Sequence, residues 1–207
     1  MQIAVVVATA LAALANWWSR LRDDDRLELW TKPLTTVLVI TLALASGAQR
    51  GDVIVAVVAL ALCLAGDVFL LPAVDRFVPG LAAFLLGHVV FIVLFVRYGL
   101  DSLALAATAA MVALVLAITV GVVIVRKAAQ HDTALRLPVA AYLAVISTMA
   151  VLGWSTGNPW VVAGTTLFVV SDSVLGWRQF VRPAPWMGPV VMVTYHGAIA
   201  ALALSLW

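Results

Sequence analysis

Long apolar stretches recur along this 207-residue chain and are separated by short segments that carry most of the charged residues. About 30 Å of hydrocarbon requires roughly 20 residues of helix at about 1.5 Å per residue. Stretches at or near that length predict eight transmembrane helices, at residues 3–18, 33–48, 53–71, 81–98, 103–125, 137–154, 160–177 and 190–206. The expected fold class is all-α, a polytopic membrane bundle that forms a single domain over residues 1–207.

Proline and tryptophan positions fit these spans. A proline at a helix start is harmless because the first N–H groups of a helix have no intrahelical acceptor. Prolines within two residues of predicted starts are Pro33, Pro79, Pro138, Pro159 and Pro189. Tryptophans near predicted ends are Trp17, Trp18, Trp30, Trp154, Trp160, Trp177 and Trp207. The tryptophans are placed as an interfacial aromatic belt would be.

Composition narrows the class of protein further. Hydrophobic residues make up 65% of the chain and charged residues only 11%, whereas soluble domains carry about a quarter charged residues. The single cysteine, Cys63, lies in an apolar stretch, which excludes a disulfide framework and a cysteine metal site. No basic cluster with interleaved aromatic residues appears, so nucleic acid is not an expected partner despite a net charge of +2.

The basic residues predict the orientation in the membrane. Ten of the 12 Lys and Arg residues fall between spans 1 and 2, 3 and 4, 5 and 6, or 7 and 8, and only Arg50 and Arg97 lie on the other side. The positive-inside rule then places both termini outside and predicts an integral protein of a bacterial inner (plasma) membrane. A cleaved signal peptide at residues 1–18 is disfavoured, because no basic region precedes it and its removal would leave an odd number of spans.

Two features recur at the same spacing. Residues 29–34 lie 105 positions before residues 134–139, each segment holding a basic residue and a proline, and Gly66-Asp67 lies 105 positions before Ser171-Asp172. This register predicts two parallel four-helix repeats, at residues 1–105 and 106–207, because four spans return the chain to its starting side.

Two acidic residues, Asp67 and Asp172, lie inside apolar stretches. A carboxylate at membrane depth is costly and usually faces a bundle interior or a wet cavity. Both aspartates lie roughly 6 to 8 Å from the cytoplasmic end of their spans. The alternative is that they cap the interface or pair with Arg76 and Arg178. We expect instead that the two aspartates carry the chemistry.

Other polar side chains fall at nearly the same depth and predict a pocket that opens toward the inner leaflet. These residues are His88, Asn16, Tyr142, Tyr195, His196 and Ser171. For His88, a catalytic role and a hydrogen bond across helices are equally compatible with the sequence. Tyr142, Tyr195 and Asn16 also suit hydrogen bonding between helices, and Ser171 suits a helix contact. The Asp23–Asp25 run has no calcium-loop spacing and reads as a solvated loop.

Missing motifs restrict the chemistry. The sequence contains no Gly-x-Ser-x-Gly, no His-Glu-x-x-His, no glycine-rich phosphate loop and no Cys–His nucleophile arrangement, which disfavours serine hydrolases, zinc proteases and nucleotide-driven machines. Acid–base chemistry by carboxylates remains, with no metal or cofactor expected. Because a low dielectric disfavours the charged form, one of two neighbouring carboxyls can stay protonated as an acid while the other acts as a base.

A set of short motifs then links the chain to a known family. The motifs are Lys32-Pro33, Gly66-Asp67-Val68-Phe69-Leu70-Leu71, Phe84-x-x-Gly87-His88-x-x-Phe91, Phe168-x-x-Ser171-Asp172-Ser173 and Thr194-Tyr195. Together they resemble the YhhN family of eight-span membrane proteins, whose characterised animal members are lysoplasmalogenases. The resemblance implies hydrolysis of the vinyl ether bond of a lysoplasmalogen to a fatty aldehyde and a glycerophospho-alcohol. His196 departs from the residue, often aromatic, expected at its position.

The implied reaction suits carboxylate chemistry and assigns roles to the polar layer. Asp67 and Asp172 are the expected acid–base pair, in either order, as in glycosidases. His88 and Tyr195 would orient water or a carboxyl, and Lys32 with Arg136 would hold the phosphate. The remaining residues expected to contact substrate are Asn16, Tyr142 and Ser171. The expected partners are a lysophospholipid and membrane lipids, and the sequence leaves the oligomeric state open.

Two other classes of protein remain as alternatives. A proton-coupled transporter or lipid flippase would also carry one acidic residue in each parallel repeat. Such a protein would need polar groups on both sides of the membrane midplane, whereas the outer half of the predicted bundle contains very few polar side chains. A non-catalytic scaffold does not explain two carboxylates that are costly to insert.

Overall fold

The computed structural model describes residues 2–207, and within them the secondary structure is helical, with no strand. The elements are α1 (Gln2–Leu21), α2 (Asp25–Leu44), α3 (Arg50–Phe69), α4 (Phe77–Tyr98), α5 (Leu103–Leu116), the π-helix η1 (Ala117–Gly121), α6 (Val122–His131), the 3₁₀-helix η2 (Thr133–Leu135), α7 (Arg136–Ser155), α8 (Pro159–Phe180) and α9 (Met187–Leu204). The described residues form eight helical segments long and apolar enough to cross a membrane, with α5, η1 and α6 together forming the fifth. The all-α class and the eight predicted spans are confirmed.

The second span differs most from its predicted bounds. Helix α2 begins at Asp25, eight residues before the predicted start, so the prediction that Pro33 begins a helix was wrong. Asp24 caps α2 by accepting a hydrogen bond from Leu27 N–H, which starts the helix inside the run read as a solvated loop. Pro33 therefore lies in the helix interior, where its ring leaves one helical carbonyl without a backbone donor. As a consequence Lys32 lies within the helix and is buried.

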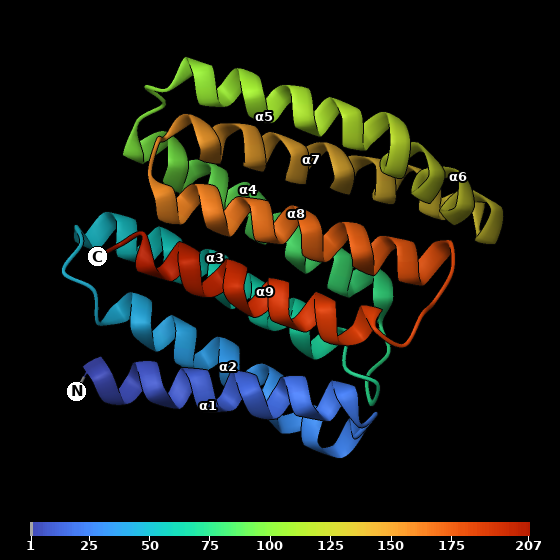
Figure 1. Ribbon diagram of the computed structural model, residues 1–207, viewed down its shortest axis with the longest axis horizontal. Helices are drawn as coiled ribbons and strands as arrows, with labels where there is room; N and C mark the ends of the chain where they lie inside the picture. Colours follow the sequence, from blue (N-terminus) through green and yellow to red (C-terminus); the bar gives the residue numbers. More distant parts are fainter. Residues whose placement is uncertain (1) are drawn as a thin grey trace.

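The helices lie nearly side by side, with α1 and α2 at one edge of the bundle and α5 and α6 at the other (Figure 1). Helix α9 is the most buried span and contacts α1, α2, α3 and α8. Both ends of the chain lie at one end of the bundle, as an even number of spans requires. The α1–α2, α3–α4, α6–α7 and α8–α9 connections form the opposite end, here called the basic end. Which membrane face the basic end occupies stays a prediction, as does the internal repeat.

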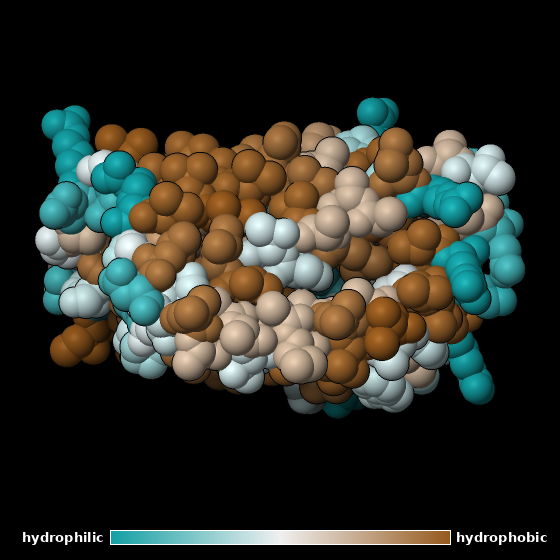
Figure 2. Space-filling model, turned by 90° about the horizontal axis from the view of Figure 1, so that it is seen from above, coloured by the Kyte–Doolittle hydropathy of each residue, from teal (hydrophilic) through white to brown (hydrophobic). Residues whose placement is uncertain are grey.

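The surface agrees with a position in the bilayer. Figure 2 shows hydrophobic residues over most of the middle of one face and hydrophilic residues gathered toward its two ends. Large apolar side chains such as Leu103 and Leu137 are more than three-quarters exposed. In water such a surface would be a severe aggregation liability, whereas lipid tails cover it without cost. The chain is therefore an integral membrane protein.

Helices α3 and α4 approach closely at Gly66, beside Asp67. A Cβ added to Gly66 would lie 2.5 Å from Phe84 Cε2, and the Phe84 ring packs edge-on against Tyr195 with centroids 5.6 Å apart. We expect Gly66→Ala to lower the free energy of unfolding by about 1–3 kcal/mol, because the aromatic ring must shift within a packed core. Unfolding in detergent micelles, followed by tryptophan fluorescence, measures this change.

Gly47→Ala is the matched control for this prediction. Gly47 lies between α2 and α3, and an added Cβ would meet nothing within 4 Å. We expect this substitution to change the free energy of unfolding by no more than about 0.5 kcal/mol. Equal stability of the two variants would show that the close approach at Gly66 is not a packing constraint.

Candidate active site

Asp67 lies in the last turn of α3 and its side chain is fully buried. Its Oδ2 accepts hydrogen bonds from Thr36 Oγ1 of α2 at 2.6 Å and from Tyr195 OH of α9 at 2.7 Å. Its Oδ1 has no hydrogen-bond partner among the described residues, and Lys32 Nζ lies 3.8 Å from it. Three helices thus hold one carboxylate beside one cation. The pairing with Arg76 or Arg178 considered from the sequence does not occur for Asp67.

Asp172 is on α8, and its side chain is 10% exposed. Its Oδ2 accepts a hydrogen bond of 2.5 Å from Tyr142 OH of α7 and lies 3.9 Å from His88 Nε2 of α4. No Lys or Arg among residues 2–207 lies within ion-pair distance of it. The two aspartates therefore differ in the number of groups that stabilise their charged form.

Asp67 and Asp172, which the sequence predicts to act as a pair, both line a cavity of about 120 Å³. We call it the central cavity. Besides Asp67 and Asp172, it is lined by four other charged residues, namely Arg20, Glu28, Lys32 and Arg178, and by Ser171 and Tyr195. Of the predicted polar layer, Asp67, Asp172, Ser171 and Tyr195 therefore line one space, and the other members lie outside it.

A much larger depression of about 980 Å³ lies between α5, η1, α6, α7 and α8. We call it the lateral groove. Its walls are mainly aliphatic, Asp172 and Ser173 line it, and Arg126, Gln130 and Arg136 are its other charged or amide-bearing residues. Asp172 also lines a third, small cavity of about 40 Å³ between α4, α7 and α8. This one carboxyl therefore lies where the polar and apolar spaces meet.

The wall of the lateral groove contains an irregularity that the sequence did not predict. The backbone is a π-helix from Ala117 to Gly121, and Ala117, Val120 and Gly121 line the groove. Single π-helical turns inside α-helices are rare and occur often at functional sites.

His88 is fully buried beside Asp172 but does not line any of the three spaces. Its ring packs edge-on against Phe168 and Tyr142, with centroids 4.8 and 5.4 Å apart. Neither ring nitrogen has a hydrogen-bond partner among the described residues. A group placed in this way can fix the position of Asp172 and Tyr142, but it does not reach a molecule in the cavities.

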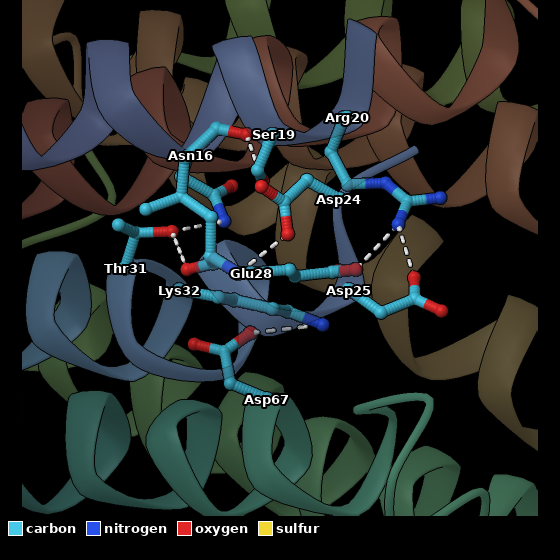
Figure 3. Close-up of polar contacts among 10 residues, drawn as sticks. Asn16, Ser19, Arg20, Asp24, Asp25, Glu28, Thr31, Lys32 and Asp67 are labelled. Carbon is cyan, nitrogen blue, oxygen red and sulfur yellow. Dashed lines mark hydrogen bonds and ion pairs between the residues drawn. The ribbon is translucent and has the colours of Figure 1, made fainter. Parts of the chain in front are cut away.

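Charged and polar residues of α1 and α2 form a network behind Asp67 (Figure 3). Arg20 of α1 pairs with Glu28 of α2 and lies 3.6 Å from Asp25, and Lys32, one turn after Glu28, points to Asp67. The sequence placed Lys32 in a loop at the membrane edge, and this position was wrong because α2 starts earlier. A phosphate at Lys32 would therefore have to enter the central cavity.

The remaining predicted residues divide into two groups. Tyr195 and Ser171 line the central cavity, where Ser171 Oγ donates a hydrogen bond to Val191 O at 3.1 Å. Asn16 is fully buried outside it and donates from Nδ2 to Thr31 Oγ1 at 3.1 Å. His196 accepts a hydrogen bond from Trp17 Nε1 at 3.1 Å. Asn16 and His196 therefore join α1 to its neighbours and lie outside the central cavity.

Sequence reasoning missed Thr36, Glu28, Arg20 and Arg178 as parts of the site. A signal for Arg178 was present, because Ser171, Leu175 and Arg178 follow the i, i+4, i+7 spacing of one helix face. All three line the central cavity. Within residues 2–207 no three His, Cys, Asp or Glu side chains gather in a way that would hold a metal ion.

Fold and site together define an α-helical integral membrane protein with two aspartates lining one buried, charged cavity. Residues 27–206 match the YhhN family, and the chain belongs to that family. It is 34% identical to human lysoplasmalogenase TMEM86B over 136 residues, which is 62% of this chain and 53% of the human protein. It is 45% identical to the rat lysoplasmalogenase TMEM86B over 73 residues, which is 33% of this chain and 29% of the rat protein.

The matched segment thus spans about half the length of the human relative and less than a third of the rat relative. No solved structure matches the chain.

Proposed function

We propose that this protein is a membrane-embedded hydrolase that cleaves the vinyl ether bond of a lysoplasmalogen, with Asp67 and Asp172 as its acid–base pair. One observation carries the proposal: both carboxyls line the central cavity, and Asp172 also lines the lateral groove. The similarity to proteins named lysoplasmalogenases supports the same reaction. The reaction needs an acid, a base and water, and it requires neither a nucleophilic side chain nor a metal.

The lateral groove suits the alkenyl chain of the substrate. Val112, Leu114, Val122 and Val170 line the groove and are also among the exposed hydrophobic residues, so the groove is open on the lipid-facing side of the bundle. A single-chain lipid can enter from the bilayer without leaving an apolar environment. With its chain in the groove, its vinyl ether bond lies near Asp172 and its polar part extends into the central cavity.

The contacts of the two aspartates distinguish their roles. Lys32, Thr36 and Tyr195 all stabilise the carboxylate form of Asp67, because a nearby cation and hydroxyl donors favour an anion. Asp172 has one hydroxyl donor and no neighbouring Lys or Arg in residues 2–207. Burial without a counter-charge favours the protonated carboxyl. We therefore assign Asp172 as the general acid and Asp67 as the general base.

The reaction balances with these two groups alone. The Asp172 carboxyl gives its proton to the alkenyl carbon β to the ether oxygen, which produces an oxocarbenium ion. Water adds to the carbon bonded to oxygen and gives a proton to Asp67. The hemiacetal then collapses: its hydroxyl proton goes to Asp172, the bond to the glycerol oxygen breaks, and Asp67 protonates that oxygen. The products are a fatty aldehyde and a glycerophospho-alcohol, and both aspartates return to their initial states.

Neighbouring residues would position this pair. Tyr142 donates a hydrogen bond to Asp172 and Tyr195 donates one to Asp67, while His88 packs beside Asp172 with its Nε2 at 3.9 Å. With the basic end toward the cytoplasm and both termini outside, as the positive-inside rule predicts, the central cavity would be reached from the inner leaflet of a bacterial plasma membrane.

Purified protein in detergent micelles tests the proposal directly. We expect a lysoplasmalogen to give a long-chain aldehyde, and reaction in ¹⁸O-labelled water to leave the glycerophospho-alcohol unlabelled, because water adds to the oxocarbenium carbon and the bond between the glycerol carbon and its oxygen stays intact. The saturated 1-alkyl lysophospholipid should give no aldehyde, since it has no double bond to protonate. Mass spectrometry measures both. Absence of aldehyde, together with pH-gradient-driven uptake of lipid into proteoliposomes, would favour the transporter alternative.

A further inference from the structure

The charged residues of the central cavity do not all have partners within the protein. Its cations are Arg20, Lys32 and Arg178. Arg20 pairs with Glu28, and Lys32 lies 3.8 Å from Asp67. Arg178 has no acidic group within 4.0 Å among residues 2–207. Arg178 is partly exposed in the last turn of α8 and lines the cavity without a counter-charge, so an anion that binds there gains a charge-assisted partner that no acidic side chain of the described residues already occupies.

A second observation points to a ligand in the same place. A Cβ added to Gly188 would lie 3.5 Å from Arg20 Nη2 and 3.6 Å from Arg178 Nη1, so two guanidinium groups flank one side-chain-free position at the start of α9. Two like charges at this spacing are stabilised by a shared anion, and guanidinium groups match phosphate oxygens with paired hydrogen bonds. Gly188 lines the cavity as well, so a group bound there meets backbone and no side chain at this position.

A third observation indicates a hydroxyl-bearing ligand. Asp67 Oδ1 is buried and lacks a hydrogen-bond partner among the described residues, although its carboxylate lines the cavity. Buried polar atoms are nearly always paired, so a hydroxyl of a ligand that reaches Asp67 from the cavity would supply the donor that this oxygen lacks among the described residues.

We propose that Arg178, with Arg20, binds the phosphate of a lysophospholipid in the central cavity, and that the free glycerol hydroxyl donates to Asp67 Oδ1. This assignment rests on the proposed function and differs from the Lys32–Arg136 site expected from sequence, because Lys32 is engaged with Asp67 and Arg136 lines the lateral groove instead. Arg178 follows Asp172 by six residues, about 9 Å along α8.

The covalent structure of the ligand fits this spacing. Long side chains in a helix lean toward its N-terminus, which shortens the separation of Arg178 from Asp172 along the helix axis, and both residues line the central cavity. In a lysoplasmalogen, three glycerol carbons separate the vinyl ether oxygen from the phosphate ester oxygen. Phosphate at Arg178 therefore leaves the vinyl ether within reach of Asp172 and the alkenyl chain in the lateral groove, which Asp172 also lines.

Binding of lipids that cannot be cleaved tests this site independently of hydrolysis. The probes are a saturated 1-alkyl lysophosphatidylethanolamine and the 1-alkylglycerol with the same chain, titrated into protein in micelles. We expect Arg178→Gln to weaken binding of the phospholipid by roughly tenfold to a hundredfold, as for loss of charge-assisted hydrogen bonds. The alkylglycerol should bind this variant as it binds the unsubstituted protein.

Arg182→Gln is the matched control, because Arg182 lies four residues further on, is exposed and does not line the central cavity. It should bind both lipids unchanged. Arg178→Lys should bind the phospholipid with an affinity between those of Arg178→Gln and Arg182→Gln, since lysine keeps the charge but cannot form the paired hydrogen bonds. If Arg178→Gln does not fold, Arg178→Lys provides the test in its place.

Two results would overturn the assignment: equal losses for both lipids in Arg178→Gln, or no loss for either. Inorganic phosphate that binds as tightly as the phospholipid would also overturn it, by showing a site for a free anion. A protein that releases no aldehyde but shows the expected dependence on Arg178 would remove the hydrolase proposal and leave the phosphate site standing.

Discussion

Replacing Asp172 by asparagine should reduce aldehyde release from a lysoplasmalogen by roughly 10²–10⁴-fold, the usual contribution of a general acid. Asparagine keeps the size of the side chain and can still accept the hydrogen bond from Tyr142 OH. It has no proton to deliver to carbon at neutral pH. The loss should therefore appear in kcat, with little change in the affinity for a saturated alkyl lysophospholipid.

The control for this prediction is Asp101→Asn, because Asp101 is exposed and lies between α4 and α5, at the end of the bundle opposite the basic end. It should retain the full rate. If Asp172→Asn keeps more than about a tenth of the rate while folding normally, then Asp172 does not deliver the proton and the assignment of the pair is wrong.

Replacing Lys32 by methionine should lower the free energy of unfolding by about 3–5 kcal/mol, the cost of removing one partner of a buried ion pair. Lys32 is 4% exposed and Asp67 is fully buried. Methionine fills nearly the same volume, so the loss comes from the charge left alone on Asp67. Unfolding in detergent micelles, followed by tryptophan fluorescence, measures it.

A double substitution separates this charge effect from packing. Lys32→Met with Asp67→Asn removes both charges, so it should be more stable than Lys32→Met alone, and the difference gives the coupling between the two side chains. Lys127→Met, at an exposed lysine of α6 at the basic end, should change stability by no more than about 0.5 kcal/mol. A double variant as unstable as Lys32→Met would indicate that packing, and not charge, is lost.

The number of spans and their approximate positions could be predicted because one physical constraint fixes them. A helix must be apolar over the thickness of the hydrocarbon, and each of the eight stretches meets that requirement locally. The start of α2 could not be predicted from hydrophobicity, since Asp24, Asp25 and Glu28 are charged. Asp24 is a residue type that commonly caps helices, whereas Pro33 marks a helix start eight residues after the observed one, and only the structure distinguishes the two.

The site could be predicted only in part, because the sequence marks single costly residues but not their contacts between helices. Asp67 and Asp172 stand out because each is costly in lipid, and that cost is a property of one residue in its own segment. Which side chains satisfy them depends on contacts between helices far apart in sequence, such as Tyr195 with Asp67 across 128 residues. In the sequence, Arg178 is one of ten basic residues that indicate membrane orientation. Its position beside Arg20 and Gly188, which suggests an anion site, appears only in the structure.

The sequence by itself determined that this protein is a membrane bundle with two costly aspartates at similar depth, because insertion into lipid is decided helix by helix. Only the tertiary structure decided that both aspartates line one cavity, that Lys32 lies beside Asp67 while no lysine or arginine among residues 2–207 reaches Asp172, and that Asp172 lines an apolar groove. These relations arise where α9 packs against α2, α3 and α8, and where α7 packs against α8. The residues involved are far apart along the chain, so the local sequence carries no signal of these contacts.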